Sequence, residues 1–352
     1  MSATRRNPGI LVPAILLLAC ATAAGAPDAF ALNRQIGRGI NIGNALEAPS
    51  EGEWGVTIKE EYFDTIRRAG FNSIRLPVCW SAHALREKPF TVDPEFFKRM
   101  DQVLAQAAAR GFLVLLTMHH YNELYRDPVG QEERFLAIWR QVAERYRDRP
   151  ASLLFEPLNE PHDHLDAPAW NRLLVRVHSV IRSSNPDRTL VFGPANYNDL
   201  RQLDALELPE GDRNLIATVH YYLPYEFTHQ GAHWAPGSDA WLGRKWTGSK
   251  PERQAIAGDF AVAAGWAKRH SRPLLLGEFG ANSKAEMASR VRWTKCVADS
   301  AVERGFSFTC WDFCAEFFGL YDRQARAWRR ELLAAVIPVI PEKDAGSGGK
   351  AR

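Results

Sequence analysis

The sequence lacks the features that mark several large protein classes. It has five cysteines in 352 residues, and they do not have the paired spacing of a zinc site. The net charge is +3, of which Arg5 and Arg6 supply two, and there is no basic patch or acidic tail, so no nucleic-acid partner is expected. No apolar run is long enough to span a membrane, and the absence of a Gly-x-Ser-x-Gly elbow argues against an esterase.

The N-terminus carries the features of an export signal. Arg5 and Arg6 form a charged region, residues 10–19 are apolar, and small residues follow as far as Ala26. We therefore expect residues 1–26 to be a signal peptide and the protein to be periplasmic or extracellular. The stretch that ends at Cys20 also resembles, imperfectly, a bacterial lipoprotein box. A lipid anchor at Cys20 is thus the alternative, and the one link to a membrane that we would expect.

Four cysteines remain after that segment: Cys79, Cys296, Cys310 and Cys314. An exported protein can form disulfides, and Cys310 with Cys314 is the nearest pair in the sequence. If both lie on one strand, they are roughly 13 Å apart, which is too far for a bridge without a turn between them. We expect buried free thiols, with the bridge between Cys310 and Cys314 as the alternative.

The sequence does contain a regular alternation of strand and helix signals, repeated eight times. The strand signals are continuous apolar runs, which are typical of parallel strands buried on both faces. They cover residues 37–44, 71–78, 112–120, 152–160, 189–196, 215–222, 273–280 and 306–313. Amphipathic helical spacing is found in residues 57–69, 93–110, 131–149, 168–184, 252–270 and 284–304.

This alternation predicts an α/β protein, a single (β/α)8 TIM barrel over residues 29–340. A doubly wound open sheet is the runner-up, but no Gly-rich phosphate fingerprint follows any strand. Thr57 and Glu60 have the spacing of a capping box for the first helix. The long connection 223–251 is rich in aromatic residues, and we expect it to form one wall of a cleft. The polar, Gly-rich tail 341–352 should be disordered.

In such a barrel, functional residues gather at the C-terminal ends of the strands. Two apolar runs end in a carboxylate here, in Leu158-Asn159-Glu160-Pro161 and in Gly277-Glu278-Phe279-Gly280. One Glu at a strand end is more often structural, but two on separate strands are what hydrolysis of a glycosidic bond requires. We therefore expect Glu160 to be the acid/base and Glu278 to be the nucleophile.

Other strand ends supply groups that suit this chemistry. Asn159 could hold a sugar hydroxyl, and Arg75 and Tyr222 could donate to Glu278 and keep it ionised. Trp311, at the end of the last apolar run, could form a stacking floor for a sugar ring. Three histidines, His119, His220 and His229, could gather in space, but nothing in their spacing demands a metal, so no metal and no cofactor is expected.

These motifs resemble glycoside hydrolase family 5, a family of retaining (β/α)8 glycosidases with catalytic Glu residues on the fourth and seventh strands. The resemblance covers about residues 32–336 and rests on Ile74-Arg75-Leu76-Pro77, His119-His120, Leu158-Asn159-Glu160-Pro161, His220-Tyr221-Tyr222, Gly277-Glu278-Phe279-Gly280 and Trp311. More narrowly, residues 37–49 and 227–232 resemble bacterial endoglucanases of this family, some of which also cleave β-mannans.

The resemblance implies a retaining double displacement, with the carboxyl groups of Glu160 and Glu278 about 5–5.5 Å apart. It also implies a polysaccharide substrate, namely β-1,4-glucan and, as an alternative, mannan or glucomannan, and a protein that acts as a monomer. Five positions carry over from the relatives as candidates that line the sugar subsites: Asn44, Glu47, His119, His120 and Trp234.

One departure from the relatives bears on the substrate. Tyr197 stands where the close relatives have Trp, so one stacking surface is smaller here, which puts activity on mannan in doubt. The functions left open are an endo-β-1,4-glucanase, an endo-β-1,4-mannanase and a catalytically silent carbohydrate-binding barrel. The presence of both Glu160 and Glu278 argues against the silent barrel, because a silent protein would be free to lose either.

Overall fold

The computed structural model describes residues 28–338. The expected signal peptide, the lipid anchor at Cys20 and the disordered tail 341–352 lie outside the described residues. Within residues 28–338, no helix is long and apolar enough to cross a membrane. The four cysteines of this range are free thiols, as expected; Cys79, Cys310 and Cys314 are buried, and Cys296 is half-buried.

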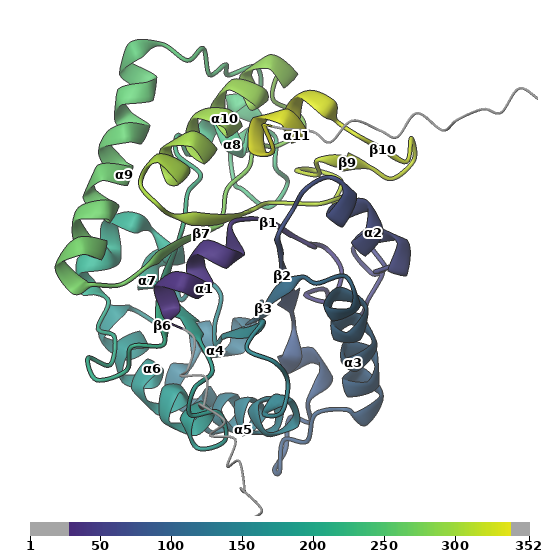
Figure 1. Ribbon diagram of the computed structural model, residues 1–352, viewed down its shortest axis with the longest axis vertical. Helices are drawn as coiled ribbons and strands as arrows, with labels where there is room; N and C mark the ends of the chain where they lie inside the picture. The colour runs from purple at the N-terminus through teal and green to yellow at the C-terminus, as the bar shows by residue number, and fades with distance from the viewer. Residues whose placement is uncertain (1–27, 339–352) are drawn as a thin grey trace, which may run out of the picture.

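Eight parallel strands close into a barrel in which each strand pairs with the next along the chain and the last pairs with the first (Figure 1). The strands are β1 (Arg38–Asn41), β2 (Ser73–Val78), β3 (Leu113–Met118), β4 (Leu153–Glu156), β5 (Leu190–Phe192), β6 (Leu215–His220), β7 (Leu274–Glu278) and β8 (Ser307–Cys310). Nearly every strand residue is buried, which explains why the apolar runs lack alternation. The predicted (β/α)8 barrel is confirmed.

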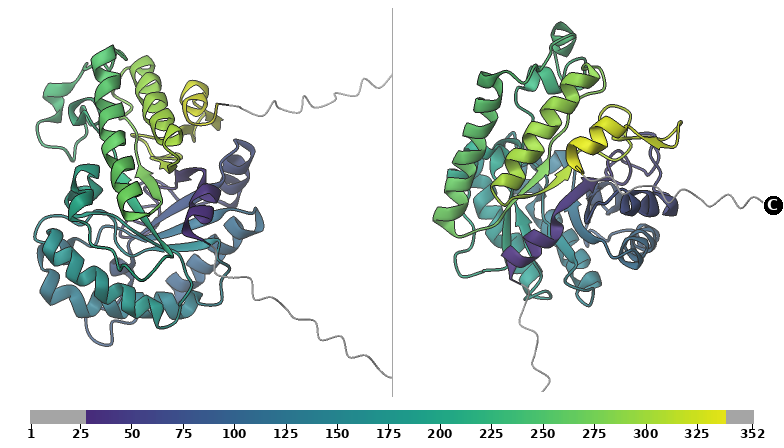
Figure 2. Two further views of the ribbon diagram at one scale, coloured as in Figure 1. Left: turned by 60° about the vertical axis from the view of Figure 1, so that its left-hand side comes forward. Right: turned by 45° about the horizontal axis from the view of Figure 1, so that its top comes forward.

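Long helices surround the barrel on its outside (Figure 2). They are α2 (Glu60–Arg68), α3 (Pro94–Ala109), α5 (Pro128–Tyr146), α6 (Ala167–Arg182), α9 (Lys250–His270), α10 (Met287–Glu303) and the shorter α11 (Arg330–Val336). The main apolar core lies between these helices and the strands. Asp93, Asp127 and Asp166 accept a backbone hydrogen bond at the starts of α3, α5 and α6, each followed directly or one residue later by Pro.

Three features differ from the sequence-based expectation. The capping box at Thr57 is wrong: α2 begins at Glu60 after Lys59, whose backbone is extended, and the backbone N–H and carbonyl of Ile58 bond to the side chains of Glu51 and Arg99. A capping box does occur in the chain, at the start of α9, between Ser249 and Glu252. The regular alternation also breaks after β5, where α7 (Ala195–Asn198) and the 3-10 helix η2 (Leu200–Ala205) replace a long helix.

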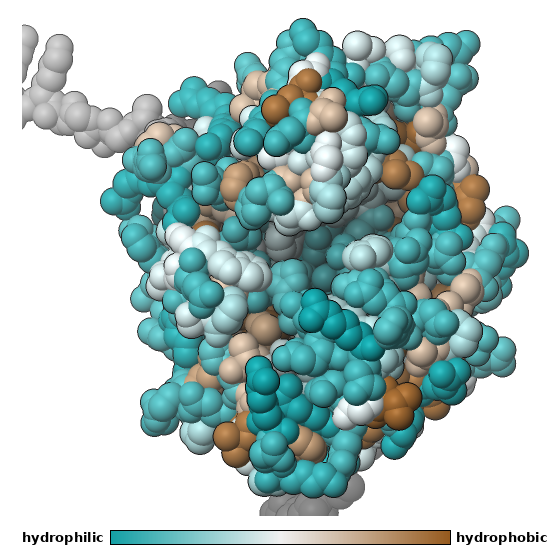
Figure 3. Space-filling view, turned by 180° about the vertical axis from the view of Figure 1, so that it is seen from behind, coloured by the Kyte–Doolittle hydropathy of each residue, from teal (hydrophilic) through white to brown (hydrophobic). Residues whose placement is uncertain are grey.

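An additional short helix, α1 (Ala29–Ile36), was not expected and closes one end of the barrel. Its apolar residues Leu32 and Ile36 pack with Leu115 and Leu275 from inside the barrel, in a second apolar cluster. Figure 1 looks onto this end, with α1 in front of the strands. Since α1 precedes β1 and covers the end where the strands begin, the opposite end is left open. Figure 3 shows that opposite face, which is hollowed near its centre.

Short elements in the connecting loops complete the fold. They are η1 (Trp80–His83), α4 (Asn122–Arg126), α8 (Tyr225–Thr228), η3 (Ser238–Trp241) and a hairpin of β9 (Tyr321–Asp322) with β10 (Ala327–Trp328). The long aromatic connection after β6 thus contains α8 and η3. The strands themselves are shorter than the apolar runs predicted. The difference matters most at β4, which ends at Glu156, four residues before Glu160.

Candidate active site

Glu160 does not end a strand, as the sequence suggested, but sits on the loop that follows β4. Pro157 directly follows β4 and has no N–H to continue the sheet hydrogen bonding. The backbone of Glu160 is left-handed, with φ of 46°, a conformation that a non-Gly residue adopts only when its surroundings hold it there. The loop carries the carboxyl group over the open end of the barrel, and the Glu160 side chain is 23% exposed to solvent.

Glu278 is the last residue of β7 and is almost fully buried. Its Oε1 accepts a hydrogen bond of 2.6 Å from Nη1 of Arg75, and its Oε2 accepts one of 2.9 Å from the Tyr222 hydroxyl. Both contacts are those expected from the sequence. A cation and a neutral hydroxyl that both donate favour the ionised carboxylate, which is the form required of a nucleophile.

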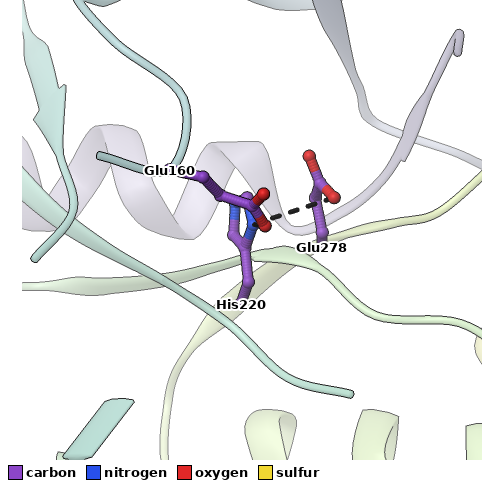
Figure 4. A group of neighbouring side chains, drawn as sticks. All are labelled: Glu160, His220 and Glu278. Atoms are coloured by element: carbon purple, nitrogen blue, oxygen red, sulfur yellow. Dashed lines mark hydrogen bonds and ion pairs between the residues drawn. The ribbon is translucent and has the colours of Figure 1, made fainter. Parts of the chain in front are cut away.

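The two carboxyl groups face each other across the open end of the barrel (Figure 4). An oxygen of Glu160 lies within 4.8 Å of an oxygen of Glu278, and Nδ1 of His220 lies between them. This nitrogen is 2.6 Å from Oε1 of Glu160 and 3.7 Å from Oε2 of Glu278. The separation fits the short carboxyl spacing of retaining glycosidases and is too small for inverting ones, which need space for a water.

The two carboxyl groups have different electrostatic surroundings. Burial raises the pKa of Glu160 to about 7, although Arg75 acts to lower it. Burial also raises the pKa of Glu278, while His220 and Arg75 lower it. Only Glu278 has a direct hydrogen bond from the guanidinium, and this hydrogen bond favours its ionised form. Burial lowers the pKa of His220 to about 4, so its ring is neutral near pH 7.

Arg75 organises the floor of the site from the centre of the barrel. Its side chain is fully buried and forms two hydrogen bonds of 2.7 Å with Glu156 on β4. It also donates to the side-chain oxygens of Asn41 at 2.9 Å and Asn159 at 2.8 Å. Because its Oδ1 is occupied by Arg75, Asn159 has only its NH2 group left to offer a sugar hydroxyl. Asn41 lies at a strand end, where functional residues were expected, whereas the sequence indicated no role for Glu156 in the site.

The histidine pair after β3 lies beside the two carboxyl groups. His119 is buried and stacks on Trp311, with ring centroids 5.9 Å apart and an interplanar angle of 10°. His120 lies two residues beyond the end of β3 and has a left-handed backbone with φ of 53°. Its ring contacts Trp54 edge-on at 5.3 Å. Trp54 is 41% exposed and was not singled out in the sequence; its position in the Gly-bounded turn 52–55 was the available signal.

Two other subsite candidates lie on the loop that follows β1. Asn44 is partly exposed and has a left-handed backbone with φ of 58°. Glu47 is only 1% exposed, and its two carboxylate oxygens accept hydrogen bonds from the backbone N–H groups of Asn44 and Ala45. In this structure Glu47 therefore fixes the loop that presents Asn44.

The aromatic candidates form the rim of the site. Tyr197 and Trp234 are 50% and 45% exposed, so their rings are available to a sugar. His229 is buried and stacks on Tyr225 at 4.0 Å, which places it behind the rim. The loop after β6 therefore supplies one side of the open end, as expected from its aromatic residues.

Among residues 28–338, one group of three side chains has ligand atoms close enough to hold a metal ion, and it is Glu160, His220 and Glu278. His119, His220 and His229, which could have gathered in space, do not form such a group in the described part of the chain. Arg75 and Tyr222 already donate to the oxygens of Glu278. These three side chains therefore suit a pair of carboxyl groups that act as acid and nucleophile.

A (β/α)8 barrel with one carboxyl group after β4 and a second at the end of β7, spaced for retention, defines the class of retaining glycoside hydrolases. Residues 37–317 match the model of a protein family described as "Cellulase (glycosyl hydrolase family 5)". The chain belongs to this family.

Solved structures and curated relatives agree with this assignment. Cel5A of Thermotoga maritima, in complex with mannotriose substrate, is 46% identical with a TM-score of 0.87, and the match covers 88% of this chain and all of that one. A structure of the same protein in complex with cellobiose gives the same figures. Endoglucanase H of Acetivibrio thermocellus is 36% identical over 89% of this chain, but the match spans only 34% of that protein. This chain thus spans about a third of the length of that relative.

Proposed function

We propose that the protein is an endo-acting retaining glycoside hydrolase that cleaves β-1,4-glucan by double displacement. The observation that carries the proposal is the pair Glu160 and Glu278, with oxygens within 4.8 Å and with different hydrogen-bond donors. A carboxyl group with a pKa near 7 and a carboxylate held by a guanidinium are the two partners that this reaction requires.

In the first step, the Glu278 carboxylate attacks the anomeric carbon while Glu160 gives its proton to the leaving glycosidic oxygen. The bond to the leaving sugar breaks, and a glycosyl ester on Glu278 forms. In the second step, the ionised Glu160 takes a proton from water, which attacks the same carbon and releases Glu278. Neutral His220 can donate its Nδ1–H to the Glu160 carboxylate, whose Oε1 is 2.6 Å away.

Two observations support β-1,4-glucan as the substrate: the similar proteins, and the aromatic residues at the rim of the site. Relatives named endoglucanase, and a structural neighbour in complex with cellobiose, support β-1,4-glucan. The mannotriose complex of that neighbour supports β-1,4-mannan or glucomannan as the second candidate. Tyr197, half exposed at the rim, offers a smaller stacking surface than the Trp of the close relatives, and so we place glucan first. A polymer is bound along an open face, which fits a monomer.

We further propose that the protein is exported, because a polymer of this kind lies outside the cell. Arg5, Arg6 and the apolar stretch 10–19 support this proposal. Fractionation of cells that express the full chain, or its Cys20→Ala variant, separates the two forms of export. Release of the wild type without membrane association supports a cleaved signal. Membrane association that is lost in Cys20→Ala supports the lipid anchor.

The activity is tested by the release of reducing ends from carboxymethyl cellulose, soluble β-glucan, glucomannan and mannan. Wild type is compared with Glu278→Gln and with Glu144→Gln, a matched change at an exposed position on α5. We expect activity on the glucans that is lost in Glu278→Gln and kept in Glu144→Gln. A fall in viscosity that precedes most of the reducing-end release identifies endo cleavage. Activity only on mannan-containing polymers would favour the mannanase, and inactivity of a folded wild type on all four would overturn the proposal.

A further inference from the structure

The three successive backbone carbonyl groups of residues 159–161 each accept one hydrogen bond, and a different residue donates each of them. The Asn159 carbonyl accepts a hydrogen bond of 2.6 Å from the Tyr125 hydroxyl. The Glu160 carbonyl accepts one of 2.5 Å from Nδ1 of His162. The Pro161 carbonyl accepts one of 3.2 Å from the backbone N–H of Tyr197. A carbonyl can only accept, so these contacts fix the Tyr125 hydroxyl and the His162 Nδ1–H as donors.

These hydrogen bonds occur where the backbone needs support. Glu160 is left-handed with φ of 46°, four residues beyond the end of β4; of its two neighbours, Asn159 donates its backbone N–H to the Met118 carbonyl, and Pro161 has no N–H to donate. Glu lacks the local side-chain bonding that lets Asn adopt this conformation, and such residues persist only when several contacts determine them. A change in φ at this position would swing the carboxyl group away from the leaving oxygen, because the side chain starts at the same Cα.

The donors are themselves fixed by stacked rings. The Tyr125 ring packs on His162 with a centroid distance of 4.0 Å, and His162 stacks on Tyr197 at 4.4 Å with an interplanar angle of 14°. Tyr125 lies on α4 and is 2% exposed, whereas Tyr197 lies on α7, in the connection after β5, and is half exposed. The loops after β3, β4 and β5 are thus joined behind the acid/base. Burial raises the pKa of Tyr125, so its hydroxyl keeps the proton that it donates.

We infer that Tyr125 and His162 are positioning residues for the proton transfer by Glu160, a role that rests on the proposed function of Glu160. Neither side chain donates to the carboxyl group itself; each holds the peptide unit from which that group projects. Their loss therefore impairs protonation of the leaving oxygen and leaves the attack by Glu278 intact. If Tyr125 and His162 contributed only to the overall stability of the protein, their loss would affect both the protonation of the leaving oxygen and the attack by Glu278, or neither of them.

The dependence of the rate on the leaving group separates these cases. A 2,4-dinitrophenyl β-cellobioside needs no proton to depart, whereas a phenyl β-cellobioside does. The value of kcat/KM reports the step that forms the glycosyl–enzyme. We expect Tyr125→Phe to lower kcat/KM for the phenyl glycoside about tenfold, part of the roughly 10²–10⁴-fold that a positioned acid supplies. For the dinitrophenyl glycoside, we expect kcat/KM to stay within about twofold of wild type.

Matched variants exclude a general effect of losing a buried hydroxyl. Tyr121→Phe removes a buried hydroxyl that bonds to Gln131 and Arg134 and not to the carbonyl groups of residues 159–161, and it should leave the rates on both substrates unaffected. His162 is partly exposed, so His162→Ala tests the same idea if Tyr125→Phe folds poorly. His162→Asn keeps an N–H donor near the position of Nδ1 and should recover part of the loss. Added azide, which needs no base, should raise kcat of Tyr125→Phe on the dinitrophenyl glycoside.

The outcomes discriminate between the inference and the function on which it rests. An equal loss on both glycosides, or behaviour of Tyr125→Phe and His162→Ala like that of Tyr121→Phe, would overturn the positioning role while leaving the enzyme assignment intact. A folded wild type that cleaves neither glycoside would overturn the proposed function, and the inference with it.

Discussion

Nη1 of Arg75 lies 2.6 Å from Oε1 of Glu278, at the centre of a barrel where neither side chain is more than 6% exposed. The same guanidinium binds Glu156 through two hydrogen bonds of 2.7 Å. One buried cation therefore faces two carboxylates, and the polar side chains of Asn41 and Asn159 complete its hydrogen bonding. This network couples the stability of the barrel to the ionisation of the proposed nucleophile.

The first prediction concerns removal of this cation. Arg75→Met should lower the free energy of unfolding by about 3–5 kcal/mol, because Glu156 and Glu278 would remain buried without a counter-charge. Urea denaturation measures the loss. Arg110→Met removes a guanidinium that is also bidentate, to Asp64, but this pair is partly exposed, so its loss should destabilise the protein much less than the loss of Arg75.

A second change tests whether the unpaired charge is the cause. Adding Glu156→Gln to Arg75→Met removes one of the two stranded carboxylates, so the double variant should recover part of the lost stability. If the double variant is less stable than Arg75→Met, the cost comes from packing of the guanidinium and not from uncompensated charge.

The second prediction concerns the alkaline limb of the pH–rate profile. Burial raises the pKa of Glu160 to about 7. The protonated form therefore prevails below about pH 7, and kcat/KM on a cellooligosaccharide should fall as the pH rises through that value. Glu160→Gln should lower kcat/KM by about 10²–10⁴-fold and abolish this limb. Glu144→Gln, at an exposed position, should keep it. If the alkaline limb persisted in Glu160→Gln, a group other than Glu160 would cause it.

The fold was readable from the sequence because parallel barrel strands are buried on both faces and therefore read as unbroken apolar runs. The proposed catalytic pair could be found because both carboxylates follow such runs. The ends of the strands were predicted less accurately. Pro157 indicates that β4 ends at Glu156, but the apolar Leu158 after it made the run look as if it continued. Glu160 consequently has a left-handed backbone that the predicted strand could not have had.

The supporting residues were harder to predict because their roles depend on contacts across the barrel. Arg75 and Glu156 are 81 positions apart, and only the register between β2, β3 and β4 brings them together. Tyr125 lies on a helix of five residues, too short to show a period. A signal was present at 196–198, where Asn-Tyr-Asn is left-handed at all three positions, since Asn favours this conformation.

The third prediction concerns the dependence of stability on pH. Burial raises the pKa of Glu47 to about 8 and that of Asp312 to about 7, as it does for Glu160. Each group therefore keeps its proton in the folded state at pH values where the unfolded chain has lost it. The free energy of unfolding should therefore fall as the pH rises between about 4.5 and 8, because the unfolded chain releases these protons at lower pH than the folded protein does.

Asp312→Asn isolates one of these groups. The variant has no carboxyl proton to lose at this position, so its stability should decline less steeply than that of wild type between pH 5 and 7. Urea denaturation at several pH values gives both slopes. Asp148→Asn, at an exposed position, should leave the wild-type slope unchanged. An unaltered slope in Asp312→Asn would mean that Asp312 is ionised in the folded protein throughout this range.

The fourth prediction concerns the exposed rim. Tyr197 is half exposed and is held by its stack on His162, so one ring face is free for a sugar. Tyr197→Ala should raise KM for cellooligosaccharides about fivefold, since the lost apolar contact is worth roughly 1 kcal/mol. Tyr197→Trp should lower KM, because the indole offers a larger face. Phe30→Ala removes an exposed aromatic ring at the opposite, α1-covered end of the barrel and should change neither KM nor kcat. If Tyr197→Ala changed kcat on the phenyl glycoside while KM stayed constant, Tyr197 would act through His162 on the acid/base and not as a sugar platform.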